Sequence, residues 1–166
     1  MRNLELDMSD ANQTHDGSHD FDFFYGRWRV QNRRLTQRLQ GCTEWEQFDA
    51  IQECAPLLGG LGNTDHMQTY EGKTVGWSLR FYNPITQRWS IYWVGGRDHL
   101  LLPPVHGAFA NGLGQFDGTD EFEGKPIWVK FLWSKMDTAT PHWEQAFSAD
   151  GDGNWEMNWE MDFTKI

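Results

Sequence analysis

The sequence predicts an all-β fold, a single antiparallel up-and-down β-barrel of about ten strands with a short N-terminal helical turn. Three observations support this prediction: a high share of aromatic residues, a hydrophobic period of two that recurs along the chain, and turn-forming residues between the repeats. Aromatic residues make up 15% of the 166 residues, with 10 Trp and 11 Phe. Large flat side chains suit pleated, half-buried surfaces, so this composition favours sheet.

The N-terminal segment differs from the rest of the chain. Residues 1–19 are polar, acidic and aperiodic, which predicts a disordered acidic tail, and residues 20–166 are predicted to form the barrel domain. Asp20 precedes an aromatic cluster that Gly26 closes. An aspartate before such a cluster and a glycine after it are typical of a short helical turn, which we expect to lead into the first strand.

Alternation between apolar and polar residues is clearest in three segments, 75–82, 89–94 and 155–164. A helix would scatter the apolar residues around its circumference, whereas successive residues of a strand point to opposite faces of a sheet. These segments are therefore predicted to be strands. In the first of them the apolar set that contains Trp77 is expected to face the core.

The remaining strand candidates are separated by turns rich in glycine, asparagine and aspartate. No long amphipathic helix interrupts them, which excludes parallel crossover units. Sequential hairpin-linked strands close naturally into a barrel, whose interior keeps some space unless side chains fill it. The candidates are 26–35, 43–54, 64–71, 105–110, 114–122, 126–134 and 141–148.

Charge and cysteine usage exclude several classes of function. The net charge is −10, with 14 basic and 24 acidic residues, which argues against nucleic acid and against an anionic membrane as partners. Cys42 and Cys54 form no C-x-x-C motif, so two free thiols in a reducing compartment are expected. The N-terminus has no apolar region typical of a signal or a membrane span. A cytoplasmic protein is therefore predicted.

The segment 22–30 contains Gly26-Arg27-Trp28 and resembles the Gly-x-Trp signature that opens the first strand of lipocalins, fatty-acid-binding proteins and nitrobindins, the calycin superfamily. In those proteins the tryptophan closes one end of the barrel beneath the ligand cavity. Residues 20–166 also resemble a group of uncharacterised bacterial calycin-like proteins. The resemblance implies the fold and only loosely a function, because such barrels include carriers, haem proteins and a few isomerases or cyclases.

The main functional prediction is binding of a small, largely apolar ligand in an aromatic-lined cavity, with a few polar groups that fix its orientation. The alternative for the same tryptophans is that they pack solidly and leave no cavity. The predicted ligand-binding residues are Trp28, Trp77, Arg80, Trp89, Trp93, His142, Gln145 and Trp159.

Histidines provide a second functional hypothesis. They are scattered singly without the spacing of a metal site, so no metal is predicted from motifs. Nitrobindins, however, hold haem iron through one histidine on a late barrel strand. His142 or His106 would take that part if this chain binds haem.

A third hypothesis is an enzyme, an isomerase, cyclase or hydrolase that acts on an apolar metabolite in the cavity. The candidate catalytic residues are Asp65 and Glu144, which lie near histidines in the sequence. A carboxylate that faces an apolar cavity has a raised pKa and acts as a general acid or base. Finally, exposed aromatic residues such as Tyr82 or Trp128 would favour a homodimer through the outer face of the barrel.

Overall fold

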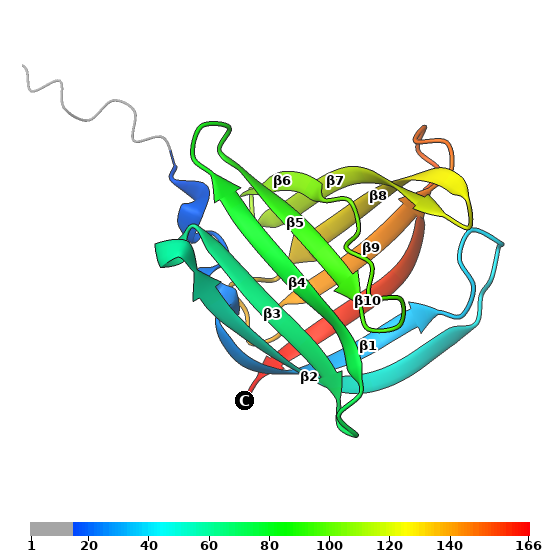
Figure 1. The fold of residues 1–166 in the computed structure, drawn as a ribbon, viewed down its shortest axis with the longest axis horizontal. Helices are drawn as coiled ribbons and strands as arrows, with labels where there is room; N and C mark the ends of the chain where they lie inside the picture. Colours follow the sequence, from blue (N-terminus) through cyan, green and yellow to red (C-terminus); the bar gives the residue numbers. More distant parts are fainter. Residues whose placement is uncertain (1–14) are drawn as a thin grey trace, which may run out of the picture.

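Ten antiparallel strands form a closed barrel in the computed structural model, which describes residues 15–166 (Figure 1). Every strand pairs with its neighbour in the sequence, and the last pairs with the first to complete the ring. The predicted all-β up-and-down barrel is therefore confirmed. The strands are β1 (Gly26–Leu35), β2 (Trp45–Leu57), β3 (Gly62–Thr69), β4 (Thr74–Asn83), β5 (Arg88–Gly95), β6 (Val105–Ala110), β7 (Leu113–Phe122), β8 (Lys125–Ser134), β9 (His142–Ser148) and β10 (Glu156–Lys165).

Turn chemistry explains two of the tightest connections. Asn111 and Gly112 join β6 to β7, and Glu123 and Gly124 join β7 to β8. All four residues have positive φ, between 50° and 76°. A two-residue hairpin turn with positive φ at both positions matches the twist of paired strands, and glycine adopts that conformation without strain.

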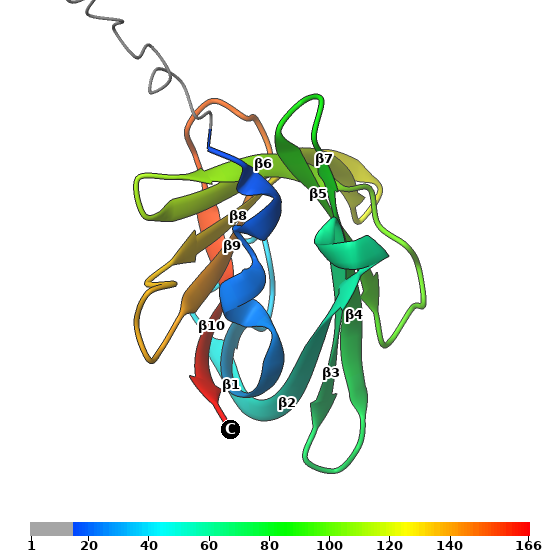
Figure 2. The ribbon, with the colours of Figure 1, turned by 90° about the vertical axis from the view of Figure 1, so that its left-hand side faces the viewer.

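Two 3-10 turns, η1 (Gly17–His19) and η2 (Asp22–Phe24), precede β1 and lie across one end of the barrel (Figure 2). The Asp16 carboxylate caps η1, because it accepts a hydrogen bond from a backbone N–H of the turn at 3.0 Å. The turn η1 therefore lies within the segment 1–19 that the sequence assigns to the tail. The rest of the predicted tail, residues 1–14, lies outside the described residues.

The connections at the opposite end are longer. The two longest, 36–44 and 96–104, join β1 to β2 and β5 to β6 (Figure 1).

A third 3-10 turn, η3 (Leu58–Gly60), joins β2 to β3. Between residues 15 and 166, no helix is long and apolar enough to cross a membrane.

Aromatic side chains fill the end of the barrel that η1 and η2 cover. Phe21 and Trp89 are fully buried and meet edge to face, with ring centroids 4.9 Å apart. Phe24 stacks on Trp28 at 5.6 Å. Trp28 Nε1 donates a hydrogen bond to the Phe24 carbonyl at 2.8 Å, and Trp89 Nε1 donates to the Gly17 carbonyl at 2.9 Å. Each buried ring contributes about 1.5–3 kcal/mol, and no indole N–H in this set is left without a partner.

β4 turns inward the face opposite to the one that its hydropathy predicts. Trp77 is 47% exposed on the outer surface, whereas Ser78, Arg80 and Tyr82 are buried. Two predictions were therefore wrong: the apolar set with Trp77 does not face the core, and Tyr82 is not exposed. The physical reason is that Arg80 forms an ion pair with the buried Asp65 on β3, so the polar face of β4 is satisfied inside the barrel.

Candidate functional site

The end of the barrel opposite η1 and η2 is open and contains a pocket of about 540 Å³. Parts of the connections 36–44, 70–73, 96–104 and 123–124 line it, together with the adjoining ends of the strands. Its volume falls within the range of small-molecule sites, roughly 300–1,000 Å³. We call this space the mouth pocket.

The mouth pocket has a mixed lining, in which polar residues outnumber apolar ones and the apolar ones include the large rings of its floor. Strand alternation turns Phe48, Trp93 and Trp159 toward the barrel axis near the open end, and the ends of other strands and one connection supply further apolar side chains. A backbone hydrogen bond from Leu102 to the Trp93 carbonyl, at 2.9 Å, holds the connection 96–104 against β5. The apolar residues of this lining are Leu35, Phe48, Val75, Trp93, Leu102, Phe122 and Trp159.

Trp93 and Trp159 form the floor of the mouth pocket. Their rings meet edge to face with centroids 5.8 Å apart. Trp159 Nε1 donates a hydrogen bond to Asn32 Oδ1 at 3.0 Å, which fixes its ring. The Trp93 indole rests on Gly76, where a Cβ atom would overlap it. Both tryptophans also border a second space deeper in the barrel, so they separate the mouth from the interior.

The interior cavity has a volume of only about 40 Å³. Since a water molecule needs roughly 10–15 Å³ of such space, this cavity holds a few waters. Aromatic and methionine side chains surround most of it, while Gln52, Ser78, Arg80 and Gln145 supply polar groups. The tryptophan-filled alternative therefore describes the interior, and the larger space for a ligand lies in the mouth pocket.

A buried ion pair occupies the middle of the barrel. Arg80 on β4 is 4% exposed and Asp65 on β3 is 1% exposed, and their side chains are in direct contact. Arg80 Nη1 also donates to Asn63 Oδ1 at 3.0 Å. The guanidinium lies over the rings of Phe21 and Phe24, at 5.1 and 5.5 Å. Arg80 is thus committed to groups within the barrel.

Several polar atoms near this pair have no hydrogen-bond partner among the described residues. They include Gln52 Oε1, Asp65 Oδ1, Arg80 Nε and Asn158 Nδ2. Gln145 Nε2, in contrast, donates to Asn158 Oδ1 at 2.8 Å. A buried polar atom without a partner costs about 1–3 kcal/mol. The barrel interior is therefore amphipathic.

Basic side chains line the rim of the mouth pocket. Arg34 donates from Nε to Glu46 Oε1 at 2.7 Å, and its guanidinium lies 5.2 Å from the Trp159 ring. Arg38 lies 5.5 Å from the Phe147 ring, and burial lowers its pKa to about 10. Positive charge therefore gathers beside the aromatic floor.

The two cysteines are free and lie at opposite ends of the barrel. Burial raises the pKa of the Cys54 thiol to about 12. A hydrogen bond with the Thr36 hydroxyl lowers the pKa of Cys42, which lies in the connection 36–44. A thiol with a raised pKa is a poor nucleophile, so Cys54 is suited to packing and not to catalysis.

The structure brings together four of the predicted ligand-binding residues. Arg80, Trp93, Gln145 and Trp159 border the interior cavity. Trp28 and Trp89 instead belong to the aromatic core under η1 and η2, and Trp77 lies on the outer surface. Trp77 Nε1 donates there to the Thr64 hydroxyl at 2.6 Å.

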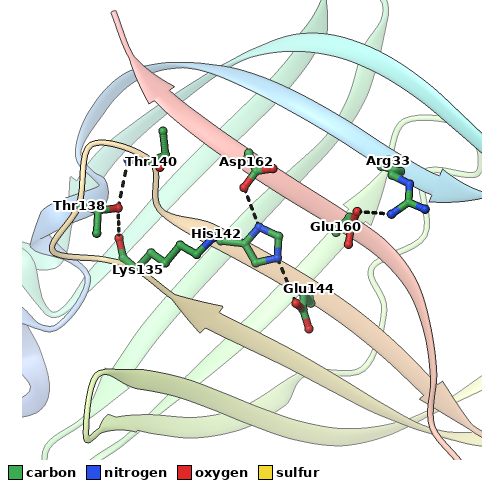
Figure 3. A network of polar contacts seen from close by, with 8 residues as sticks. All are labelled: Arg33, Lys135, Thr138, Thr140, His142, Glu144, Glu160 and Asp162. Carbon is green, nitrogen blue, oxygen red and sulfur yellow. Dashed lines mark hydrogen bonds and ion pairs between the residues drawn. The ribbon is translucent and has the colours of Figure 1, made fainter.

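His142 and Glu144 project from the outer face of β9 (Figure 3). His142 Nδ1 lies 2.7 Å from Asp162 Oδ1, and its Nε2 lies 3.1 Å from Glu144 Oε1. The intervening Trp143 and the following Gln145 border the interior cavity, so strand alternation turns His142 and Glu144 away from it. Neither the predicted ligand-binding histidine nor this candidate catalytic carboxylate lines a barrel cavity.

The haem hypothesis requires a histidine that faces an internal space. His106 is exposed on β6, where its Nδ1 lies 2.8 Å from the Ser90 hydroxyl, and both ring nitrogens of His142 have carboxylate partners. These two histidines therefore do not fit an axial ligand inside the barrel. Across residues 15–166, no group of three or more His, Cys, Asp or Glu side chains is arranged to hold a metal ion.

The sequence patterns did not single out the polar residues of the mouth and interior, notably Asn32, Arg34 and Gln52. Asn32 and Arg34 continue the same inward alternation that begins at Trp28, so a period-two count along β1 would have found them. Arg38 lies in a connection, where no periodicity exists to indicate its direction.

No protein-family model matches the chain, and no curated protein matches it either. The closed ten-stranded antiparallel barrel is nevertheless consistent with a calycin-like fold.

Proposed function

We propose that this protein binds a small, largely apolar molecule at the open end of a calycin-type barrel. The observation that carries the proposal is the mouth pocket of about 540 Å³ with Trp93 and Trp159 as its floor. The interior behind these rings has only about 40 Å³ of free space. A ligand of ordinary metabolite size therefore fits the mouth and not the interior.

The floor is suited to a flat or chain-like apolar group. Indole rings offer large apolar faces at low conformational cost, and the contacts of Trp159 with Asn32 and of Trp93 with Gly76 hold both rings before a ligand arrives. A preformed site loses less entropy on binding than a flexible one, which favours affinity.

Two further features support the proposed relation to calycins and the proposed cytoplasmic location. Trp28, from the Gly-x-Trp segment, lies in the aromatic core of the closed end, which is the position that the resemblance implies. Free thiols at Cys42 and Cys54 suit a reducing compartment. The side chain of Trp128 is 41% exposed, which is compatible with the proposed homodimer. Sedimentation analysis would test that prediction.

The test is a fluorescence titration with N-phenylnaphthylamine, a neutral apolar probe. We expect it to bind the native protein with one site and to quench tryptophan emission. Trp93→Ala removes half of the floor and is expected to weaken binding about tenfold. The matched control is Trp77→Ala, which removes an outer-face tryptophan. Equal affinity in the two variants, or no binding to the native protein, would contradict the proposal.

A further inference from the structure

The mouth pocket concentrates basic side chains in an acidic protein. The chain has a net charge of −10, whereas the lining of this pocket has a small positive balance: Arg34, Arg38, Lys73 and Arg97 lie there with the carboxylates of Glu46, Asp98 and Glu123. Arg34 is neutralised by Glu46, which it contacts at 2.7 Å. The remaining cations are therefore available to another partner.

Arg38 forms no ion pair with the residues that the structure describes. Arg27, Arg33, Arg34 and Arg80 form ion pairs within residues 15–166, and Arg38 does not. Its Nε is buried and makes no hydrogen bond to the described residues. Glu156 and Glu46 lie near enough to favour the charged guanidinium, but neither forms an ion pair with it, so an incoming anion would gain an N–H donor that the described residues leave unused.

The nearby carboxylate of Glu156 forms no ion pair with Arg38, although its charge raises the Arg38 pKa. Both of its oxygens accept a hydrogen bond from the Leu39 backbone N–H, at 2.8 and 3.0 Å. Burial lowers the pKa of Arg38 most, and the positive charges of Arg34 and Arg97 lower it further, whereas the carboxylates of Glu156 and Glu46 raise it. Arg38 and Arg97 together therefore form a positive site at the pocket wall.

We infer that Arg38, with Arg97 beside it, binds an oxyanion carried by the ligand of the mouth pocket. This inference rests on the proposed function and names its ligand class: an amphipathic acid whose apolar part lies on Trp93 and Trp159. A guanidinium offers paired N–H donors that match the two oxygens of a carboxylate, sulfonate or phosphate. Arg80 is not the residue that binds this oxyanion, because its guanidinium already contacts Asp65 and donates a hydrogen bond to Asn63.

The experiment compares two probes that differ by one sulfonate: anilinonaphthalene sulfonate and the neutral N-phenylnaphthylamine. We expect the native protein to bind the sulfonate about tenfold more tightly. Arg38→Gln should bring the ratio of the two dissociation constants close to one, and Arg38→Lys should give an intermediate ratio. Arg29→Gln is the matched control, because it removes the same charge from an exposed position on the outer face of β1.

The outcomes separate the two proposals. If the neutral probe binds through Trp93 but the sulfonate binds no more tightly, or if Arg38→Gln leaves the ratio unchanged, the anion site is overturned and the proposed function stands. Binding of neither probe to the native protein overturns both. Circular dichroism of each variant establishes that a changed ratio does not come from a changed fold.

Discussion

The two ends of the barrel use the same residue types in different ways. At the closed end Trp89 is surrounded by Phe21, Tyr82 and the backbone of η1, and its N–H is bonded there. At the open end Trp93 has one face on Gly76 and borders free space on the other side. Whether a tryptophan stabilises the fold or forms a site therefore depends on the groups that surround its ring: packed side chains in one case and free space in the other.

The largest expected difference between the two ends is in stability. Trp89→Ala leaves a cavity in a packed core, so we expect a loss of about 4 kcal/mol in the free energy of unfolding. Phe48→Ala removes a ring that already borders the mouth pocket, and a loss of about 1 kcal/mol is expected. Urea denaturation measures both. Similar losses would mean that the mouth is packed like the core.

A smaller effect is expected where the two ends meet, at the buried ion pair. Asp65→Asn leaves the Arg80 charge buried without its partner, which should cost about 3 kcal/mol. The double variant Asp65→Asn with Arg80→Met removes that charge and should recover part of the loss. Glu160→Gln breaks the more exposed pair with Arg33 and should cost less than about 1 kcal/mol. If Asp65→Asn and Glu160→Gln cost the same, the buried pair has no special role.

The smallest expected effect compares one cysteine at each end as pH rises. The Cys54 pKa is raised from 9.0 to about 12, so between these values the unfolded chain releases a proton that the folded chain keeps. Stability then falls with pH, and between about pH 8 and about pH 10.5 the native protein should lose about 1–2 kcal/mol more than Cys54→Ala. The Cys42 pKa is lowered, so its contribution has the opposite sign, and Cys42→Ala should lose slightly more stability than the native protein in this range. Identical pH profiles for Cys54→Ala and the native protein would contradict burial of this thiol.

Local patterns were enough to predict the barrel. Alternation over 155–164 and the Asn111-Gly112 turn are short-range signals, and the structure has a strand and a hairpin at those places. The facing of β4 was not predictable in this way. Alternation defines the two faces of a strand but does not say which one is buried. Hydropathy favoured the face of Trp77, because the residue that pairs with Arg80, Asp65, lies on another strand and does not enter a local pattern.

The candidate site was predictable only in part for the same reason. Trp93 and Trp159 follow from strand alternation and large side chains. Arg38 does not, because its position in a connection carries no period, and the burial of its unbonded Nε is a property of the folded chain. His142 was misleading, since its type suggested a ligand while its neighbours on β9 already turned it outward.

The pairing of β1 with β10 gives this barrel a late folding step. The first strand pairs with the last, from Trp28 with Lys165 to Arg34 with Trp159, and Ile166 N–H donates to the Arg27 carbonyl at 3.0 Å. During synthesis the edge of β1 has no partner until β10 has been made, and contacts of such high sequence separation form slowly. Until β10 arrives, β1 and β9 each expose an unpaired edge that attracts other chains. The emergence of β10 from the ribosome therefore turns an aggregation-prone sheet into a ring without edges.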